Sequence, residues 1–160
     1  MIRIGYGMDA HRLTESRPLV LCGVTVPHEK GLLGHSDADV ATHALMDALL
    51  GAAALGDIGT LFPDRDERYR GARSVDLLRA VTEQVAEAGY EPVNVDVTIA
   101  AQRPVLRPHI GAMREQWAAA MGLPLGCVSV KATTTEGMGY EGAEEGISAQ
   151  AVCLLREKES

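Results

Sequence analysis

The pattern of apolar and polar positions predicts four main strands and one small hairpin. Residues 93–101, VNVDVTIAA, alternate strictly, which is typical of a strand with one face in water. Residues 2–12, 127–136 and 146–155 predict three further strands, the last two around a glycine-rich loop. Residues 19–27, LVLCGVTVP, predict two short strands.

Three segments predict helices, namely residues 38–56, 74–89 and 107–122. In the first, apolar residues recur on one face near the helical period, and Asp37 or Asp39 can cap its start. In the second, Ser74 is the expected N-cap. Residues 28–37 and 57–73 predict loops, with no linker or repeat between them.

Strands that alternate with helices predict an α+β fold. We expect a single domain over residues 1–160, built as a two-layer α/β sandwich. Its main layer would be mostly a four-stranded sheet, accompanied by the small hairpin and covered by helices on one face.

Composition places this fold in the class of cytoplasmic proteins. The chain has 160 residues, of which 46% are hydrophobic, enough for a real core. No apolar run approaches the length of a membrane span, and residues 1–30 lack the pattern of a signal peptide. Cys22, Cys127 and Cys153 are widely spaced and form no CxxC, which predicts reduced thiols rather than disulfides or a cysteine–zinc cluster.

The formal net charge of −7 argues against nucleic acid or an anionic membrane as the partner, because both need a basic face. An acidic chain can still bind a small anion if metal ions, backbone amides or helix N-termini supply positive charge locally.

The sequence MDAHR, residues 8–12, is the first candidate for chemistry. In an extended strand Asp9 and His11 point to the same side, so a carboxylate and an imidazole converge as a zinc ion requires. His43 lies in an alanine-rich helix that can approach this strand closely, and Asp39 or Asp47 could accept its other ring N–H. Three protein ligands would leave an open position, as in a catalytic zinc site; an exposed pair with an unrelated histidine is the alternative.

His35 and Ser36 precede the first helix, where free backbone amides make a positive terminus. An imidazole, a hydroxyl and free amides together suit a phosphate group. Ordinary helix capping would explain the same residues.

The run ATTTE, residues 132–136, ends at a glycine-rich turn. Threonine is common in strands, but three successive hydroxyls cannot all face a core without cost. Hydroxyls next to Glu136 suit phosphate oxygens bound with a hard cation such as Mg²⁺.

Asp57, Asp64 and Asp66 share the predicted loop 57–73. Carboxylates in a loop are usually solvated, and the hydroxyl groups of a polyol would be their functional partners. His28 and His109 are interpreted as structural or surface residues.

In combination these segments resemble the family of 2-C-methyl-D-erythritol 2,4-cyclodiphosphate synthases, enzymes of the non-mevalonate isoprenoid pathway. The resemblance runs from Met1 to about Leu155 and is carried by GYGMDAHR, KGLLGHSDADVATHALMDALLGAAALGDIGTLFPD, NVDVTIAAQRP and VKATTTEGMGYEG.

The resemblance implies a metal-dependent phosphorus–oxygen lyase in the cytoplasm. The substrate would be 4-diphosphocytidyl-2-C-methyl-D-erythritol 2-phosphate, whose 2-phosphate attacks the β-phosphate to give the cyclodiphosphate and CMP. It also implies a homotrimer with active sites at the subunit boundaries.

Residue by residue, the resemblance assigns Zn²⁺ to Asp9, His11 and His43, and a second ion, Mg²⁺ or Mn²⁺, to Glu136. The resemblance assigns the positioning of phosphate groups in the transition state to His35 and Thr134. Ser36 is also expected to bind substrate. The expected methylerythritol pocket consists of residues 57–59 and 62–66, and includes Asp57, Ile58, Gly59, Phe62, Pro63, Asp64 and Asp66. The expected cytidine cradle spans 101–107 and 132–135, and includes Ala101, Pro104, Leu106, Arg107, Ala132, Thr133 and Thr135.

The sequence departs from the family pattern at two places, one near the expected CMP end of the substrate and one near a possible isoprenoid diphosphate. Where members often carry a basic residue, Val105 and Leu106 are apolar, which leaves Arg103 or Arg107 to meet the CMP end. Tyr140 keeps the family's aromatic residue and is included among the binding residues. Ala143 replaces an arginine that lines a central trimer cavity in many members, which argues against an isoprenoid diphosphate as a regulatory ligand.

Two other functions fit parts of the pattern. A zinc phosphohydrolase could use metal-bound water on the same three ligands. A non-catalytic trimer that binds a metal or an isoprenoid is the second alternative. In both, the threonine run and the aspartate loop have no particular task.

Overall fold

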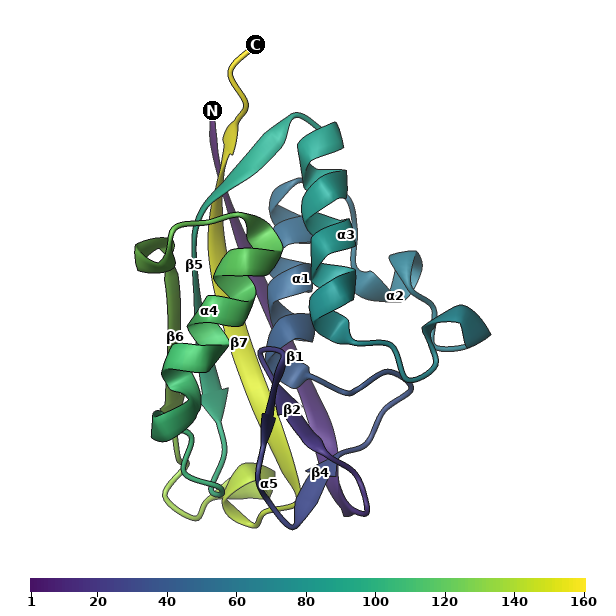
Figure 1. Ribbon diagram of the computed structural model, residues 1–160, viewed down its shortest axis with the longest axis vertical. Helices are drawn as coiled ribbons and strands as arrows, with labels where there is room; N and C mark the ends of the chain where they lie inside the picture. Colours follow the sequence, from purple (N-terminus) through teal and green to yellow (C-terminus); the bar gives the residue numbers. More distant parts are fainter.

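The computed structural model describes residues 1–160 and contains a five-stranded sheet in the order β4-β1-β7-β5-β6 (Figure 1). Its strands are β1 (Ile2–Glu15), β4 (Lys30–Leu32), β5 (Tyr90–Ala100), β6 (Val128–Thr133) and β7 (Gly146–Glu157). β5 and β6 run parallel, whereas the other neighbours are antiparallel. β2 (Leu19–Leu21) and β3 (Val24–Val26) form the separate hairpin that the sequence predicts.

The prediction of four strands in the main sheet was wrong by one short strand. β4 lies within residues 28–37, which the sequence predicts as a loop. It pairs with the end of β1, where Leu13 is opposite Leu32, so β1 also continues past residue 12. A three-residue strand at a sheet edge is too short to show alternation, and only its partner reveals it.

Helices cover one face of the sheet, as predicted (Figure 1). The three longer ones are α1 (Val40–Ala52), α3 (Ser74–Glu87) and α4 (Ile110–Met121). Two single-turn helices, α2 (Ile58–Leu61) and α5 (Gly139–Gly142), lie in segments predicted as loops. Three 3₁₀ turns complete the chain, η1 (Glu67–Tyr69), η2 (Arg107–His109) and η3 (Leu125–Cys127). The chain has no helix with the length and apolar character that crossing a membrane requires.

α1 is buried on almost every side rather than along one face. It packs against β1, β7 and α3. Its only positions that are not fully buried are His43, Asp47 and Gly51, which recur every fourth residue and so form one stripe. A helix that is apolar around most of its circumference belongs in the core, and its single polar stripe therefore marks the face that carries the site.

Two glycines let β1 and α1 come close together. A Cβ atom added to Gly5 would lie 1.9 Å from the Ala48 carbonyl oxygen, and one added to Gly7 would lie 2.0 Å from that of Ala44. No side chain fits at either position. The small residues of α1 therefore meet a strand with no side chains at the contact, which brings His43 next to Asp9 and His11.

Asp39, one of the two predicted caps, is the N-cap of α1. Its fully buried carboxylate accepts hydrogen bonds from Cys22 N–H (2.9 Å), Gly23 N–H (2.8 Å), Thr42 N–H (3.1 Å) and the Thr42 hydroxyl (2.7 Å). Thr42 Oγ1 also accepts from the buried indole N–H of Trp117 at 3.0 Å. One carboxylate thus joins the start of α1 to the hairpin.

Replacing Asp39 by alanine is expected to lower the free energy of unfolding by about 3 kcal/mol or more, because several buried donors lose their acceptor. Urea denaturation measures this change. Asp76→Ala, which removes an exposed carboxylate from the first turn of α3, is the matched control and should change stability little. Equal midpoints for the two variants would contradict the role of Asp39.

The opposite face of the sheet carries exposed apolar side chains that no helix covers. Ile2, Ile4, Tyr6 and Met8 alternate along β1, and each exposes more than half of its surface. Val152 of β7 lies opposite Tyr6 and is 41% exposed. A contiguous apolar patch of this kind marks an interaction surface rather than ordinary protein surface.

Candidate functional site

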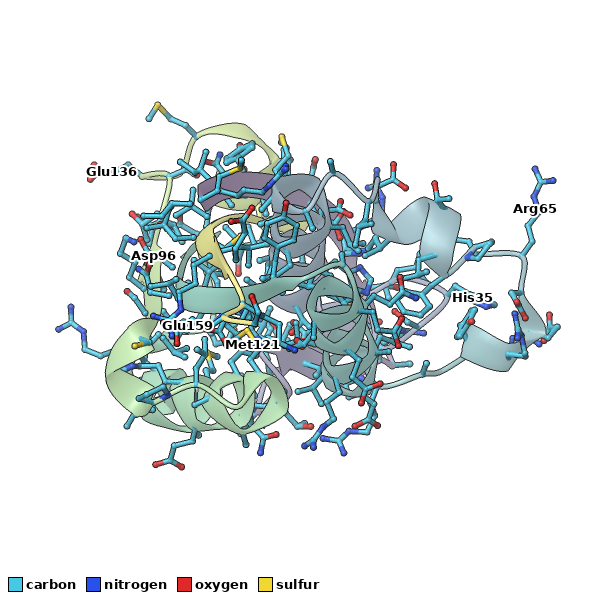
Figure 2. The ribbon with its side chains drawn as sticks, turned by 90° about the horizontal axis from the view of Figure 1, so that it is seen from above. His35, Arg65, Asp96, Met121, Glu136 and Glu159 are labelled. Atoms are coloured by element: carbon cyan, nitrogen blue, oxygen red, sulfur yellow. The ribbon has the colours of Figure 1, made fainter.

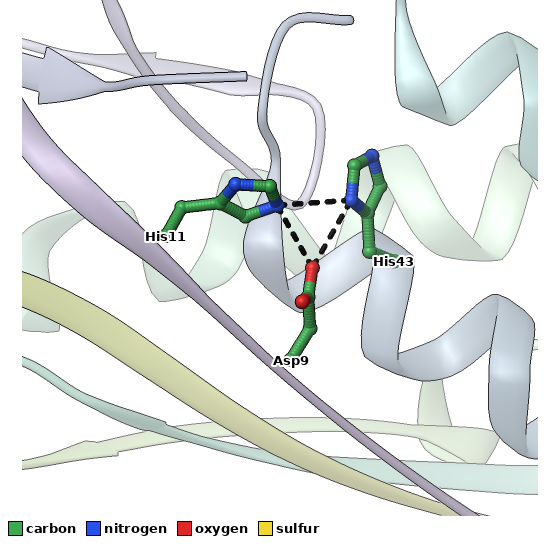
Figure 3. Close-up of side chains that lie close together, drawn as sticks. All are labelled: Asp9, His11 and His43. Atoms are coloured by element: carbon green, nitrogen blue, oxygen red, sulfur yellow. Dashed lines mark hydrogen bonds and ion pairs between the residues drawn. The ribbon is translucent and has the colours of Figure 1, made fainter. Parts of the chain in front are cut away.

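Asp9, His11 and His43 converge on one point between β1 and α1 (Figure 3). Asp9 Oδ2 lies 2.9 Å from His11 Nε2 and 3.1 Å from His43 Nδ1, and the two ring nitrogens are 3.2 Å apart. Asp9 and His11 are two residues apart on the helix-facing side of β1, as the strand period predicts. The structure therefore confirms the prediction from the sequence that these three residues lie close together.

The outer nitrogens of both rings have hydrogen-bond partners. His11 Nδ1 donates to the Leu33 carbonyl at 3.0 Å, which leaves Nε2 facing the point of convergence in the neutral ring. His43 Nε2 lies 3.1 Å from Ser36 Oγ and 2.9 Å from Ser74 Oγ. The expectation that Asp39 or Asp47 would partner His43 was wrong. Asp39 is occupied at the helix cap, and Asp47 accepts from Ile58 N–H at 2.8 Å.

Burial and hydrogen bonding act in opposite directions on these groups. Burial alone would raise the pKa of the Asp9 carboxyl, but the hydrogen bonds and positive charge of protonated His11 and His43 rings together outweigh burial and hold this pKa well below its ordinary value. Burial lowers the pKa of His11, but the hydrogen bond to Asp9, the negative charge of Asp9 and the hydrogen bond to Leu33 together outweigh burial and raise that pKa. The Asp9 carboxylate is therefore ionised, and the raised pKa of His11 favours a protonated ring beside it.

A metal ion fits the geometry of the three atoms. Tetrahedral ligands about 2.0–2.1 Å from zinc lie about 3.3 Å from one another, close to the observed separations of 2.9–3.2 Å. Two neutral imidazole nitrogens and one carboxylate oxygen are a donor set that zinc accepts. Asp9, His11 and His43 therefore form a candidate metal centre.

The candidate metal centre opens into a cavity of about 390 Å³, here called the metal-side cavity. His35 and Ser36 line it, and His35 Nε2 donates to the Asp66 carbonyl at 3.0 Å. Arg17 positions this segment by donating to the carbonyls of Leu32 (2.7 Å) and Ser36 (2.9 Å). An imidazole and a hydroxyl thus stand beside the three converging ligands, as the sequence suggested.

The predicted polyol pocket is only partly assembled around this cavity. Ile58, Gly59, Phe62 and Asp64 line it, whereas Asp57, Pro63 and Asp66 do not. Asp57 caps α2 by accepting from Thr60.

Asp66 forms a salt bridge with Arg68. The Asp66 side chain is half-buried, and its hydrogen bonds to Arg68 lower its pKa. Carboxylates that cap turns or pair with arginine hold the loop in place rather than face the cavity.

A second cavity of about 710 Å³, here called the nucleotide-side cavity, lies between the segment after β5 and the end of β6. The expected cradle residues that line it are Ala101, Pro104, Leu106, Arg107, Ala132, Thr133 and Thr134. Thr135 does not line it, because its hydroxyl turns away and donates to the Met138 carbonyl. Arg107 lines this cavity, whereas Arg103 points to Glu144 at 3.9 Å.

Glu136 follows β6 in a tight turn. Its φ angle of 56° lies in the left-handed region, and its N–H donates to Thr134 Oγ1 at 3.3 Å. A non-glycine residue in this region carries some strain, which is common at binding sites.

The two cavities do not meet within one chain. Figure 2 shows His35 on one side of the molecule and Glu136 on the opposite side. The two cavities share no lining residue. The structure therefore assembles the candidate metal centre but leaves Thr134 and Glu136 apart from it.

Tyr140 lines neither of these cavities. It borders a smaller one of about 150 Å³ near His11 and Gly146.

Several lining residues were missed by the sequence analysis. In the metal-side cavity they are Gly34, Met46, Tyr69 and Leu77, and in the nucleotide-side cavity Ile110, Val130 and Lys131. Lys131 had a usable signal, since alternation along β6 places it on the same side as Thr133.

Residues 2–156 match the model of the YgbB family. The 2-C-methyl-D-erythritol 2,4-cyclodiphosphate synthase of Salinibacter ruber is 59% identical over 155 residues, which cover 97% of this chain and 99% of that protein. The protein of the same name from Moorella thermoacetica is 60% identical over 159 residues, covering 99% and 98%.

Solved structures give the same picture. A 2C-methyl-D-erythritol-2,4-cyclodiphosphate synthase in its CDP-bound form is 45% identical, with a TM-score of 0.89, and the match covers 96% of this chain and 100% of that one. The bifunctional IspDF of Campylobacter jejuni is 42% identical, with a TM-score of 0.96, over 99% of this chain and 43% of that larger chain.

Proposed function

The chain belongs to the YgbB family, and from this membership and the site geometry we propose that it is a 2-C-methyl-D-erythritol 2,4-cyclodiphosphate synthase. The observation that carries the proposal is the convergence of Asp9, His11 and His43 beside His35, in a chain that matches the family from residue 2 to residue 156. This is an enzyme of isoprenoid biosynthesis.

The reaction is an intramolecular phosphoryl transfer. An oxygen of the 2-phosphate of 4-diphosphocytidyl-2-C-methyl-D-erythritol 2-phosphate forms a bond to the β-phosphorus. The bond between the β-phosphorus and the oxygen that bridges it to the α-phosphorus breaks, and CMP leaves with that oxygen. Because the substrate supplies its own nucleophile, the protein's task is to hold two anionic groups together and in line.

Two metal ions support this task in the proposal. Asp9, His11 and His43 would hold Zn²⁺, and Glu136 would hold Mg²⁺ or Mn²⁺. Bound cations supply the positive charge that offsets repulsion between the phosphates, which explains how a chain with a net charge of −7 binds such a substrate. His35 and Ser36 orient the attacking phosphate in the metal-side cavity, and Thr134 orients the diphosphate.

The two cavities have different tasks. The metal-side cavity, with Ile58, Gly59, Phe62 and Asp64, takes the methylerythritol part. The nucleotide-side cavity, with Leu106, Arg107 and Ala132, takes the cytidine part. Its volume of about 710 Å³ suits a nucleoside monophosphate.

The two cavities lie apart in one chain but would have to bind the same substrate. A homotrimer would bring them together at the boundaries between subunits. In the proposed assembly, the metal-side cavity of one subunit faces the nucleotide-side cavity of the next. The exposed apolar side chains of Ile2, Ile4, Tyr6 and Met8 support burial of this sheet face between subunits. A cyclic trimer uses the same pair of surfaces three times, which gives three equal sites.

We also propose that residues 1–160 form one domain and that the protein works in the cytoplasm. A single cluster of 37 buried residues runs through the helices and the sheet, which supports one domain. Cys22 and Cys153 are buried free thiols, and burial raises the pKa of Cys153 to about 11, so both suit a reducing compartment.

Product analysis tests the proposed reaction. The purified protein with Zn²⁺ and Mg²⁺ is expected to release one CMP for each cyclic diphosphate formed, and no oxygen from ¹⁸O-labelled water should enter either product. Phosphorus NMR and mass spectrometry measure both. Solvent ¹⁸O in the products would indicate the phosphohydrolase instead, and absence of CMP release would indicate a binding protein.

A further inference from the structure

Ser74 contacts His43 of the candidate metal centre, Asp37 contacts Ser74, and neither residue lines either cavity. Ser74 is the first residue of α3, and its side chain is fully buried. Its Oγ lies 2.9 Å from His43 Nε2 and 2.5 Å from Asp37 Oδ1. The sequence predicts Ser74 as the N-cap of α3, and this was wrong. Arg73 occupies that position without a side-chain bond, and Asp37 Oδ2 accepts from Ser74 N–H at 3.0 Å.

The direction of each hydrogen bond follows from the groups present. An ionised carboxylate only accepts, so the single hydroxyl hydrogen of Ser74 points to Asp37. The remaining lone pairs of Ser74 Oγ can then only accept, and the donor is His43 Nε2–H. In the neutral ring this leaves Nδ1 without a hydrogen, and Nδ1 is the atom that faces Asp9.

Ser36 alone does not determine which nitrogen of His43 carries the hydrogen. Its Oγ accepts from Ala38 N–H at 3.2 Å and lies 3.1 Å from His43 Nε2, but no carboxylate fixes its hydroxyl hydrogen. That hydrogen could point to His43 or into the cavity. Of the two hydroxyls beside Nε2, only that of Ser74 has its direction set by an acceptor.

We propose that the Asp37–Ser74 pair fixes the tautomer and orientation of His43 and thereby raises the zinc affinity of the site. This inference rests on the proposed function, because it takes Asp9, His11 and His43 as zinc ligands. Ser74 and Asp37 are positioning residues and do not touch substrate. They lie in segments 37 residues apart in sequence, so they also tie the start of α3 to the segment before α1.

Zinc titration against a competing chelator tests the pair. Ser74→Ala keeps the backbone N–H that Asp37 accepts and removes only the hydroxyl. It is expected to weaken zinc binding about 10–100-fold, as loss of an outer partner of a ligating histidine does. The absorption bands of Co²⁺ bound in place of zinc should also change, because the His43 ring is no longer held.

Asp37→Asn tests the same pair and keeps the shape of the side chain. Because the amide has only one oxygen in place of two, it cannot accept from both the N–H and the hydroxyl of Ser74 in the observed geometry. As a single variant, Asp37→Asn should weaken zinc binding. In the Ser74→Ala background it should add little further loss, because both changes remove the same interaction. Thr82→Ala is the matched control, as it removes a hydroxyl elsewhere in α3 that bonds only to the Leu78 carbonyl. Thermal unfolding of the chelated variants confirms that each one folds.

The outcomes separate this inference from the function on which it rests. Unchanged zinc affinity in Ser74→Ala, or additive losses in the double variant, would overturn the positioning role alone. Unchanged zinc affinity in His43→Ala, measured in the same titration, would overturn the metal centre of the proposed function.

Discussion

Replacing His43 by alanine is expected to abolish stoichiometric zinc binding and to lower turnover by about 10³-fold or more. Loss of one of three protein ligands leaves an incomplete site, and stabilisation of phosphoryl charge by a metal supplies several kcal/mol. Each 1.36 kcal/mol corresponds to a factor of ten in rate, so several kcal/mol gives this loss. Metal analysis of the purified protein and the rate of CMP release measure the two effects.

The fold should survive this change. The His43 side chain is 12% exposed and lies at the edge of a cavity, so truncation leaves space that water can enter. His28→Ala is the control, because His28 lies between β3 and β4 and lines no cavity described above. It should keep zinc and turnover. A His43→Ala protein with a full complement of zinc would contradict the assignment of this residue as a ligand.

The strand pattern predicted the position of Asp9 and His11 because side-chain direction in a strand has a period of two. The closeness of His43 was predictable only in part. Small residues in α1 suggested a close approach, but the other half of that contact, Gly5 and Gly7 in β1, passed unnoticed. A glycine pair in a strand signals an approach only when its partner is known.

The partners of His43 show where inference from one sequence stops. Positions four residues away on a helix suggested Asp39 and Asp47, because they share its face. The atoms that bond to it are Ser36 Oγ and Ser74 Oγ, and Ser74 begins a helix 31 residues further along the chain. Local periodicity describes neighbours within an element, whereas a contact between elements depends on how they pack. The short strand β4 was missed for the same reason, since its only signal is the pairing with β1.

The separation of the two cavities leads to a prediction about mixed assemblies. If each active site joins the metal-side cavity of one subunit to the nucleotide-side cavity of the next, two different inactive variants should restore each other. His43→Ala disables the metal side and leaves the nucleotide side intact. Glu136→Ala does the reverse, because it removes the proposed ligand of the second cation on the far side of the chain.

Coexpression with two different affinity tags, followed by purification on both, yields only mixed trimers. Every such trimer, whether it contains one or two copies of His43→Ala, has one boundary at which both intact halves meet. Turnover per trimer is therefore expected to reach about one third of the wild-type value, whereas each variant alone stays nearly inactive. Mixing the two purified variants without subunit exchange is the control and should restore nothing.

A site contained within one subunit predicts a different result, because each subunit would then carry its own defect and the mixed trimers would be no more active than the average of the two variants. Failure to recover protein carrying both tags would contradict the oligomer itself. The experiment therefore separates a shared site from an isolated one without needing the absolute activity of either variant. It also tests one explanation for the presence of an exposed apolar face on β1 and two separate cavities in the same chain. In this explanation, a single contact between subunits covers the apolar face and joins the two cavities.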